Sequence, residues 1–246
     1  MIQSNRSCLL HKNKGITLGL IAARKGSVGL KKKNLIKIQN QTITKTALKL
    51  AIKCSAIDNV ILSTDSNKIL NLIKKNKKLI KLKRKKSLSK NNTTMLSVIK
   101  NAVTFYEKTK KKKISKLVIF DPTSPLRTME DIQRAIKIFN KKKPNLLLSV
   151  HEAQHNPYFS IVEKKEKYYR LCKNPEKNPG TRQEVSKVYE INTIVWIYSR
   201  HAIFSEKKRI PKKTLIFKTP VERSIDIDTS DDIDRIYYYL NKSNKI

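Results

Sequence analysis

Short apolar runs that alternate with segments of helical periodicity are the feature that most constrains how this chain folds. Five such runs occupy the first part of the chain, at 16–23, 59–65, 79–83, 116–121 and 146–150. Apolar residues at helical spacing lie between them, in 42–54, 67–75, 93–108 and 129–140. Strands that alternate with helices form βαβ units, whose right-handed crossovers place helices on both faces of a mostly parallel sheet. The pattern therefore predicts an α/β fold with a Rossmann-like, mostly parallel sheet.

Polar loops follow three of the predicted strands, at 24–34, 64–66 and 121–128. Ligands in open α/β sheets bind beyond the carboxyl ends of the strands. We therefore expect these loops to converge on one edge of the sheet and to form a binding site there.

The segment 151–198 departs from the alternating pattern, because prolines and a glycine interrupt its short aromatic and apolar runs. We interpret it as a small inserted arm of antiparallel strands and loops, and we interpret His151 and His155 as ordinary surface histidines. The core pattern resumes with a strand at 214–219 and a final helix from about 230 to 240. The chain then divides into a basic N-terminal extension, 1–15, and one domain, 16–246.

The net charge of +36 at pH 7 raises nucleic-acid binding as a hypothesis. Lysine supplies most of the excess, and lysine runs such as 74–78 and 110–113 contain few aromatic side chains that would stack on bases. We attribute most of this charge to composition at surface positions, and we do not expect nucleic acid as the partner.

The spacing of the cysteines and the length of the apolar runs indicate where in the cell the protein resides. The three cysteines are scattered and lack metal-ligand spacing to one another or to histidines, which is typical of free thiols in a reducing environment. No apolar run approaches the length of a membrane span. We therefore expect a cytoplasmic protein without a membrane partner.

A basic loop punctuated by glycines, Arg24 to Asn34, follows the first predicted strand. Gly26 and Gly29 favour a turn whose backbone N–H groups point at an anion, and Arg24 and Lys33 add positive charge. The loop matches neither G-x-G-x-x-G nor a Walker A motif. On spacing alone, a phosphate-binding loop and an ordinary lysine-rich turn therefore explain it equally well.

Two carboxylates near the C-terminus form a stronger signal. Asp226 and Asp228 alternate with isoleucines, and strand periodicity places both carboxylates on the same side. Two carboxylates that point the same way repel each other unless a cation bridges them, and Mg²⁺ accepts one or two carboxylates together with substrate phosphates. Asp231 and Asp232 are explained instead by the start of the final helix. We therefore predict a magnesium site at Asp226 and Asp228.

These segments together resemble the acylneuraminate cytidylyltransferases, a family that includes CMP-sialic acid synthetases and their legionaminic and pseudaminic acid relatives. The family pattern A-R-x-G-S-K-G-[IL]-P-x-K-N is similar to ARKGSVGLKKKN at 23–34. The patterns S-T-D, Q-P-T-S-P-L-R, R-Q-[ED]-L-P-x-V-Y-x-x-N-G and D-I-D-T-x-x-D resemble, in the same order, 63–65, 121–127, 182–193 and 226–232. Five motifs in one order are far more specific than any single motif.

The resemblance implies a nucleotide-diphospho-sugar transferase fold and an enzyme that activates an acidic nine-carbon sugar with CTP, with Mg²⁺ as cofactor. It implies catalytic roles for Arg24, Lys33, Asp226 and Asp228, of which the two aspartates would bind the metal. The residues implied for CTP binding are Ala23, Arg24, Ser27, Lys33, Asn34 and Arg84. The residues implied for sugar binding are Asp121, Thr123, Ser124, Arg182, Gln183 and Asn192. The turn 121–127, which contains Arg127, would face the sugar, and the arm would form a homodimer interface.

Some positions depart from the family pattern. Val28 stands where Lys is usual, Asp121 replaces Gln, and Glu190 replaces an Arg found in some members. The first change removes positive charge beside the phosphates, and the other two add negative charge near an acidic sugar. Asp121 and Glu190 together weaken the case for sialic acid itself and leave a related sugar open. The alternatives to an active enzyme are a catalytically impaired nucleotide-binding homologue and a basic nucleic-acid-binding protein.

Overall fold

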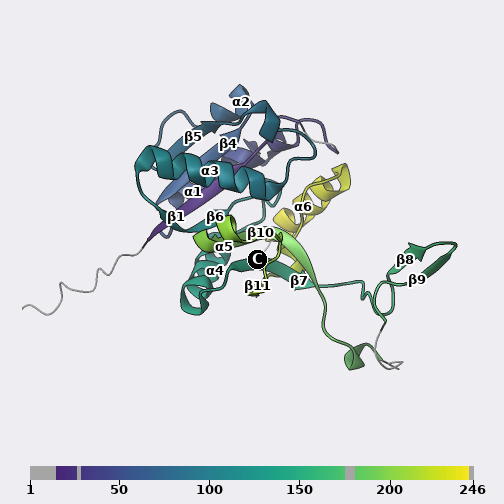
Figure 1. Cartoon of the computed structure of the whole chain (residues 1–246). Helices are drawn as coiled ribbons and strands as arrows, with labels where there is room; N and C mark the ends of the chain where they lie inside the picture. The colour runs from purple at the N-terminus through teal and green to yellow at the C-terminus, as the bar shows by residue number, and fades with distance from the viewer. Residues whose placement is uncertain (1–14, 27–28, 175–180, 244–246) are drawn as a thin grey trace, which may run out of the picture.

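The computed structural model describes residues 15–26, 29–174 and 181–243 (Figure 1). The N-terminal extension, apart from Gly15, lies outside the described residues, as do Ser27 and Val28. The side chain of Arg182 is likewise outside the described part.

A seven-stranded sheet forms the centre of the molecule (Figure 1). In spatial order its strands are β11 (Thr214–Lys218), β7 (Leu146–Glu152), β10 (Tyr189–Ser199), β6 (Ile114–Ile119), β1 (Ile16–Ala22), β4 (Asn59–Thr64) and β5 (Leu79–Lys83). Strand β10 runs antiparallel to β6 and β7, whereas the other neighbouring pairs are parallel. The mostly parallel α/β sheet expected from the sequence is therefore confirmed.

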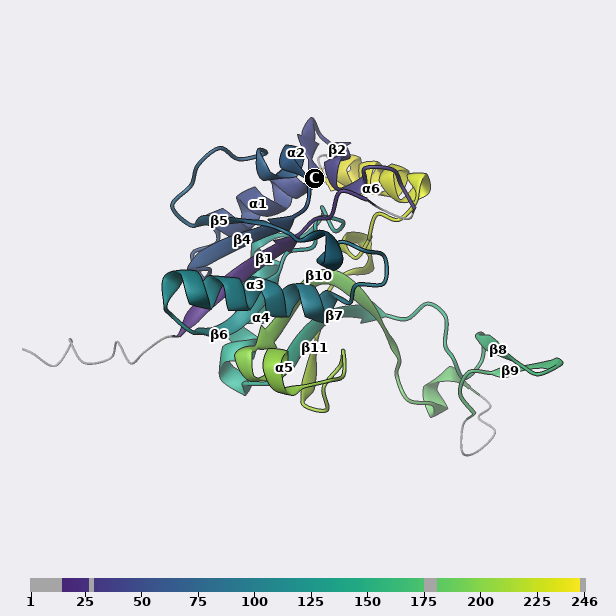
Figure 2. The ribbon, with the colours of Figure 1, turned by 45° about the horizontal axis from the view of Figure 1, so that its top comes forward.

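Helices cover both faces of the sheet (Figures 1 and 2). Helices α1 (Ile43–Lys53) and α4 (Met129–Lys142) share one buried cluster with the strands, while α3 (Met95–Lys110) and α5 (Arg200–Ser205) share another. Strands that are buried on both faces have nearly continuous apolar sequences. Burial on both faces therefore explains the continuous apolar runs from which the strands were predicted.

A third, smaller cluster holds the C-terminal part of the chain against the first loop region. Helix α6 (Ser230–Ser243) and the short strands β2 (Lys37–Ile38) and β3 (Gln41–Thr42) enclose it. Its buried members are Ile38, Ile43, Ile225, Ile227 and Ile236. Because Ile225 and Ile227 face inward, this packing sets the position of the residues that alternate with them.

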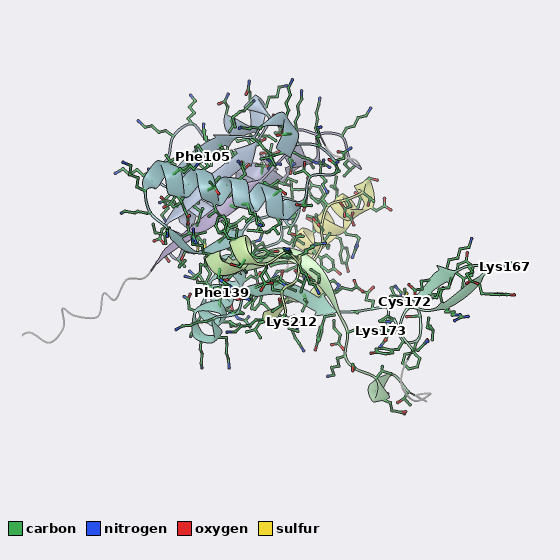
Figure 3. All side chains as sticks on the ribbon, in the orientation of Figure 1. Phe105, Phe139, Lys167, Cys172, Lys173 and Lys212 are labelled. Atoms are coloured by element: carbon green, nitrogen blue, oxygen red, sulfur yellow. The ribbon has the colours of Figure 1, made fainter. Side chains whose placement is uncertain are left out.

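An arm projects from one end of the sheet, where β8 (Val162–Lys165) and β9 (Tyr168–Leu171) form an antiparallel hairpin (Figures 1 and 2). Lys167 lies at its tip, away from the body of the protein (Figure 3). The arm is shorter than predicted, because 189–198 belongs to β10 in the middle of the sheet. The run Ile194–Ile197 is buried on both faces, which is typical of a central strand.

Two other expectations need correction. The helix expected over 67–75 is a single turn, α2 (Asn67–Leu70). Asn71 is its C-cap residue, and asparagine is unfavourable in a helix interior because its side chain competes for backbone hydrogen bonds. The segment 224–228 is not a strand, although its side chains alternate between buried and cleft-facing positions as predicted.

Among the helices of the described residues, none combines the length and the apolar character that crossing a membrane requires.

Candidate active site

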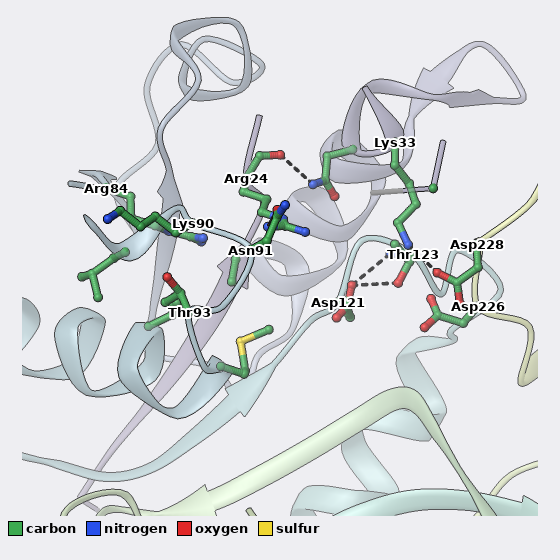
Figure 4. Close-up of a pocket in the computed structure, with 16 residues that line it drawn as sticks. Arg24, Lys33, Arg84, Lys90, Asn91, Thr93, Asp121, Thr123, Asp226 and Asp228 are labelled. Carbon is green, nitrogen blue, oxygen red and sulfur yellow. Dashed lines mark hydrogen bonds and ion pairs between the residues drawn. The ribbon is translucent and has the colours of Figure 1, made fainter. Parts of the chain in front are cut away.

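A cleft of about 400 Å³ opens at the carboxyl ends of β1, β5 and β6 (Figure 4). The loops that follow these strands meet the segment before α6 there, as expected for ligand sites in such sheets. Its lining includes Arg24, Lys33, Asn34, Arg84, Lys90, Asn91, Thr93, Met95, Asp121, Thr123, Asp226 and Asp228. Arg24, Arg84 and Lys90 form a basic wall of this cleft. Asp121, Asp226 and Asp228 form an acidic wall.

The basic wall is held by hydrogen bonds to neighbouring elements. Arg84 is almost fully buried, and its guanidinium donates to the Ser63 hydroxyl at 3.1 Å and to the Ser63 carbonyl at 2.8 Å. Burial lowers the pKa of Arg84, which Asp65 raises and Arg24 lowers further, yet a guanidinium stays charged at neutral pH. Arg24 donates to the Asn91 side chain at 2.7 Å. The wall therefore presents oriented cations before any ligand binds.

Asn34 shapes the loop that carries Arg24 and Lys33. Its amide donates to the Arg24 carbonyl at 2.9 Å, and its own carbonyl accepts from the buried Thr44 hydroxyl at 2.6 Å. Ala23 is fully buried and donates its N–H to the Ser63 carbonyl, so it supports the loop from below. Of the predicted CTP-binding residues, Arg24, Lys33, Asn34 and Arg84 line the cleft.

Gly29 allows this loop to approach the acidic segment closely. A Cβ atom at Gly29 would lie 2.9 Å from the backbone oxygen of Asp228, a separation that real Cβ atoms essentially never show. The backbone carbonyl cannot move aside as a flexible side chain would. Any larger residue here would therefore push apart the two segments that form the cleft.

The acidic wall contains a buried carboxylate oxygen without a partner. Within the described residues, Oδ1 of Asp226 is buried and makes no hydrogen bond. Burial and the charge of Asp121 raise the pKa of Asp226 to about 6, against the lowering effects of Thr123 and Lys33. Asp228 is exposed by comparison and pairs with the Lys33 ammonium at 2.8 Å. The wall thus holds a buried carboxylate oxygen that no hydrogen-bond donor of the described residues satisfies.

This arrangement fits Mg²⁺. The oxygen ligands are hard, one of them is buried and unsatisfied, and Mg²⁺ typically takes one or two carboxylates with substrate phosphates completing its shell. No group of three or more carboxylate, histidine or cysteine side chains in the described ranges forms a closed metal cage. Asp226 and Asp228 would therefore hold the ion in an open site that needs the phosphates of a ligand.

Asp121 and Thr123 lie on the acidic wall, as two of the six predicted sugar-binding residues. Thr123 donates both its backbone N–H, at 3.2 Å, and its hydroxyl, at 2.9 Å, to Oδ1 of Asp121. These bonds fix the Asp121 carboxylate near Asp226, which accounts for the repulsion between the two.

The structure does not bring Ser124, Asn192 or Gln183 to the cleft, and the side chain of Arg182 lies outside the described part of the chain. Ser124 is buried and bonded to the Thr193 hydroxyl. Asn192 is buried, with its amide donating to the hydroxyls of Thr219 and Ser224. Gln183 lies in the arm, beside a different hollow that also contains Glu152. The motifs alone did not show which polar residues line the cleft and which form hydrogen bonds inside the protein.

Arg127, expected to face the sugar, points into the protein instead. Its guanidinium donates to the Asp121 carbonyl at 2.9 Å, to the Thr193 carbonyl at 2.8 Å and to the Ile194 carbonyl. Burial lowers its pKa to about 10, and Phe120 lies under its guanidinium carbon at 5.7 Å. Arg127 therefore anchors the turn that carries Asp121 to β10.

The interpretation of His151 as an unsupported surface histidine was wrong. Its Nε2 lies 3.2 Å from a carboxylate oxygen of Glu190, and its side chain is only 13% exposed. The other Glu190 oxygen accepts from the Gln154 N–H at 3.2 Å. Glu190 therefore belongs to the root of the arm, where its charge is partnered.

Sequence reasoning missed part of the cleft and an adjoining recess. Lys90, Thr93 and Met95 line the cleft, but nothing distinguished them within a lysine-rich loop. A second recess of about 520 Å³ shares Met95 and Asp121 with the cleft. Its remaining wall is mainly apolar, with Leu96, Ile119, Trp196 and Tyr198, and has Lys207 and Arg209 at its rim.

Comparison with known proteins agrees with this geometry. The model of the family described as Cytidylyltransferase matches residues 18–238. Post-translational flagellin modification protein B of Campylobacter coli is 26% identical over 224 residues, which cover 91% of this chain and 94% of that protein. CMP-N,N'-diacetyllegionaminic acid synthase of Campylobacter jejuni is 28% identical over the same shares of the two chains.

Among solved structures, CMP:2-keto-3-deoxy-manno-octonic acid synthetase complexed with CTP is similar, with a TM-score of 0.62 and 12% identity. The match covers 93% of this chain and 99% of that one. At this identity the likeness shows a shared fold, and the family match confirms the resemblance seen in the motifs.

Proposed function

Because the chain belongs to the cytidylyltransferase family, we propose that it transfers the cytidylyl group of CTP to an acidic nine-carbon sugar and releases pyrophosphate. The observation that carries the proposal is the cleft itself, in which oriented cations face a buried, unpartnered carboxylate. A triphosphate with its divalent ion satisfies both walls at once. The names of the relatives support the sugar class.

The basic wall suits the nucleotide. Arg24 and Lys33 would neutralise phosphate charge, while the fixed guanidinium of Arg84, near Lys90 and Thr93, would lie toward the nucleoside. Mg²⁺ bound by Asp226 and Asp228 would neutralise the phosphates and orient them. Lys33 is already paired with Asp228, so it sits where metal and phosphate charges meet.

In the proposed reaction, the anomeric hydroxyl oxygen of the sugar attacks the α-phosphorus of CTP. The hydroxyl gives its proton to solvent, a bond forms between its oxygen and the α-phosphorus, and the bond from the α-phosphorus to the bridging oxygen of the leaving pyrophosphate breaks. Pyrophosphate carries away the negative charge. Such transfers depend mainly on positioning and charge neutralisation, which oriented side chains such as Arg84 and Arg24 provide without reorganisation.

The recess beside the cleft suits the sugar. Met95 and Asp121 border both spaces, so a sugar in the recess would reach an α-phosphate in the cleft. The apolar wall would contact acyl and methyl groups rather than hydroxyls, which favours an acylamino, deoxy sugar. The rim cations Lys207 and Arg209 complement an acidic substrate.

The arm is proposed to form a homodimer interface. Its hairpin exposes Tyr168, Tyr169 and Val162 to at least 57%, and large exposed apolar side chains on one hairpin are typical of an interaction surface. A partner arm at the cleft would also explain why Gln183 lies away from its own cleft.

The test is a panel of sugars assayed for pyrophosphate release with CTP and Mg²⁺. The panel contains N,N'-diacetyllegionaminic acid, pseudaminic acid, N-acetylneuraminic acid and the eight-carbon 2-keto-3-deoxy-manno-octonic acid. We expect release that depends on sugar and is stopped by EDTA, with the diacylamino sugars turned over fastest. CTP binding without release for any sugar would support the catalytically impaired alternative and contradict the enzyme.

A further inference from the structure

Asp226 lies in a segment without regular secondary structure, so something other than a helix or a strand must hold it in place. The segment 219–229 crosses the surface between β11 and α6, and within it only a single turn, Val221–Arg223, is helical. Hydrogen bonds to other parts of the chain hold this segment on both sides of Asp226.

The stronger of these ties is an ion pair. Arg223 donates to Oδ1 of Asp131 at 2.6 Å, and the Asp131 side chain is only 2% exposed. Oδ2 of Asp131 accepts from the backbone N–H and hydroxyl of Thr128, at 3.0 and 2.9 Å, in the capping box that starts α4. Thr128 directly follows the turn 121–127. Asp131 therefore joins the segment of Asp226 to the turn that carries Asp121.

Asn192 provides a second tie. Its amide donates to Thr219 at 2.9 Å and to Ser224 at 3.0 Å, and the two hydroxyls lie 3.0 Å apart. After Asp226, the N–H of Ile227 donates to the Thr123 carbonyl at 2.9 Å. The carboxylate is thus restrained from both directions along the chain.

We infer that Arg223, through Asp131, and Asn192, through Ser224, are positioning residues that hold Asp226 opposite Asp121 for a divalent cation. The two carboxylates would separate if their segments were free, because like charges in a partly buried site repel. The ties join these segments to α4 and β10 instead. This inference rests on the proposed function, since it assigns the ties a purpose only if the cleft binds a metal–nucleotide complex.

The chain offers a matched control for breaking the ion pair. Arg200 pairs with Glu107 at 2.8 Å, and the two arginine side chains, Arg223 and Arg200, are 34% and 35% exposed. Glu107 lies about 18 Å along α3 from Met95 at the cleft, at 1.5 Å per residue. Arg223→Met therefore removes an ion pair near Asp226, and Arg200→Met removes one far from it at an arginine of similar exposure.

The experiment measures Mn²⁺ binding by electron paramagnetic resonance, in the presence of the α,β-methylene analogue of CTP, at a temperature where circular dichroism shows each variant to be folded. Loss of a group that orients a metal ligand typically costs 10–100-fold in metal affinity. We expect Arg223→Met to weaken Mn²⁺ binding at least tenfold, Arg223→Lys to recover most of the loss, and Arg200→Met to stay within twofold of the wild type.

Equal Mn²⁺ affinity in Arg223→Met and the wild type would overturn the inference, and so would equal losses in both methionine variants. If the wild type itself bound no Mn²⁺–nucleotide complex, the proposed function would fail instead. Should Arg223→Met not fold, Ser224→Ala removes one hydroxyl bonded to Asn192. A roughly threefold loss is then expected, and faster hydrogen exchange at Ile225–Asp228; unchanged affinity and exchange would refute the assignment.

Discussion

Replacing Asp226 by asparagine should make the metal-free protein more stable while removing its activity. The pKa of Asp226 is raised from 3.8 to about 6 in the folded protein, mainly by burial and by Asp121. The folded state therefore holds a proton that the unfolded chain has released, and stability falls as the pH rises from about 4 through 6. Asparagine carries no charge and avoids this loss.

The magnitude follows from linkage. At about 1.4 kcal/mol for each pH unit, the difference between 3.8 and about 6 corresponds to about 3 kcal/mol above pH 7. For a chain of this size, that is a rise of roughly 6–12 °C in Tm. The advantage of Asp226→Asn should be nearly complete at pH 8 and should shrink to about 0.5 kcal/mol at pH 4, where the unfolded carboxylate also becomes protonated.

The assay is thermal unfolding in EDTA at pH 4 to 8, followed by circular dichroism, for the wild type, Asp226→Asn and the control Asp228→Asn. The Asp228 side chain is 71% exposed and paired with Lys33, so its replacement should give no stabilisation. Adding Mg²⁺ and CTP should stabilise the wild type more than Asp226→Asn. An advantage of Asp226→Asn that is absent at pH 8, or equal at pH 4 and pH 8, would refute the reasoning.

Three further predictions concern other parts of the molecule. Lys33→Met should lower kcat/KM for CTP at least about 100-fold, measured by pyrophosphate release, because it removes the cation that pairs with Asp228 beside the proposed metal and phosphate site; a loss under threefold would contradict that role. Arg127→Met should cost about 3–5 kcal/mol of stability in urea unfolding, because it removes a buried guanidinium that donates to three backbone carbonyls; a cost below 1 kcal/mol would contradict the anchor. Replacing Tyr168 and Tyr169 by serine should convert the proposed dimer into monomers in light scattering without changing the monomer Tm by more than about 2 °C; a dimer mass that stays unchanged would exclude the hairpin from the interface.

The strands and the location of the cleft could be predicted from the sequence for two physical reasons. Central strands buried on both faces need continuous apolar runs, and the loops after parallel strands share one edge of the sheet. Arg24, Asp121 and Asp226 meet in space although about 200 residues separate the first from the last, because strand order determines which loops are neighbours. The alternation at 225–228 correctly placed the carboxylates although no strand forms, since two buried isoleucines impose the same two-residue period.

What the sequence did not reveal depends on partners that are distant along the chain. Asn192 and Arg127 are polar residues in motifs, and their use in internal bonds became visible only when β10 was placed between β6 and β7. The boundary of the arm was misplaced for the same reason. Lys90 lies on the cleft, but in a chain with 55 lysines and arginines no local pattern separates it from solvated neighbours.

The most direct measurement is the rate of pyrophosphate release from CTP by the wild type and by Asp226→Asn, with N,N'-diacetyllegionaminic acid and Mg²⁺ at saturation. If the Asp226 carboxylate binds the metal beside the phosphates, the wild type should release pyrophosphate rapidly. The variant, folded and still binding CTP, should release it at least about 100-fold more slowly. Equal rates for the two proteins would show that Asp226 does not hold the metal and would contradict the proposed site.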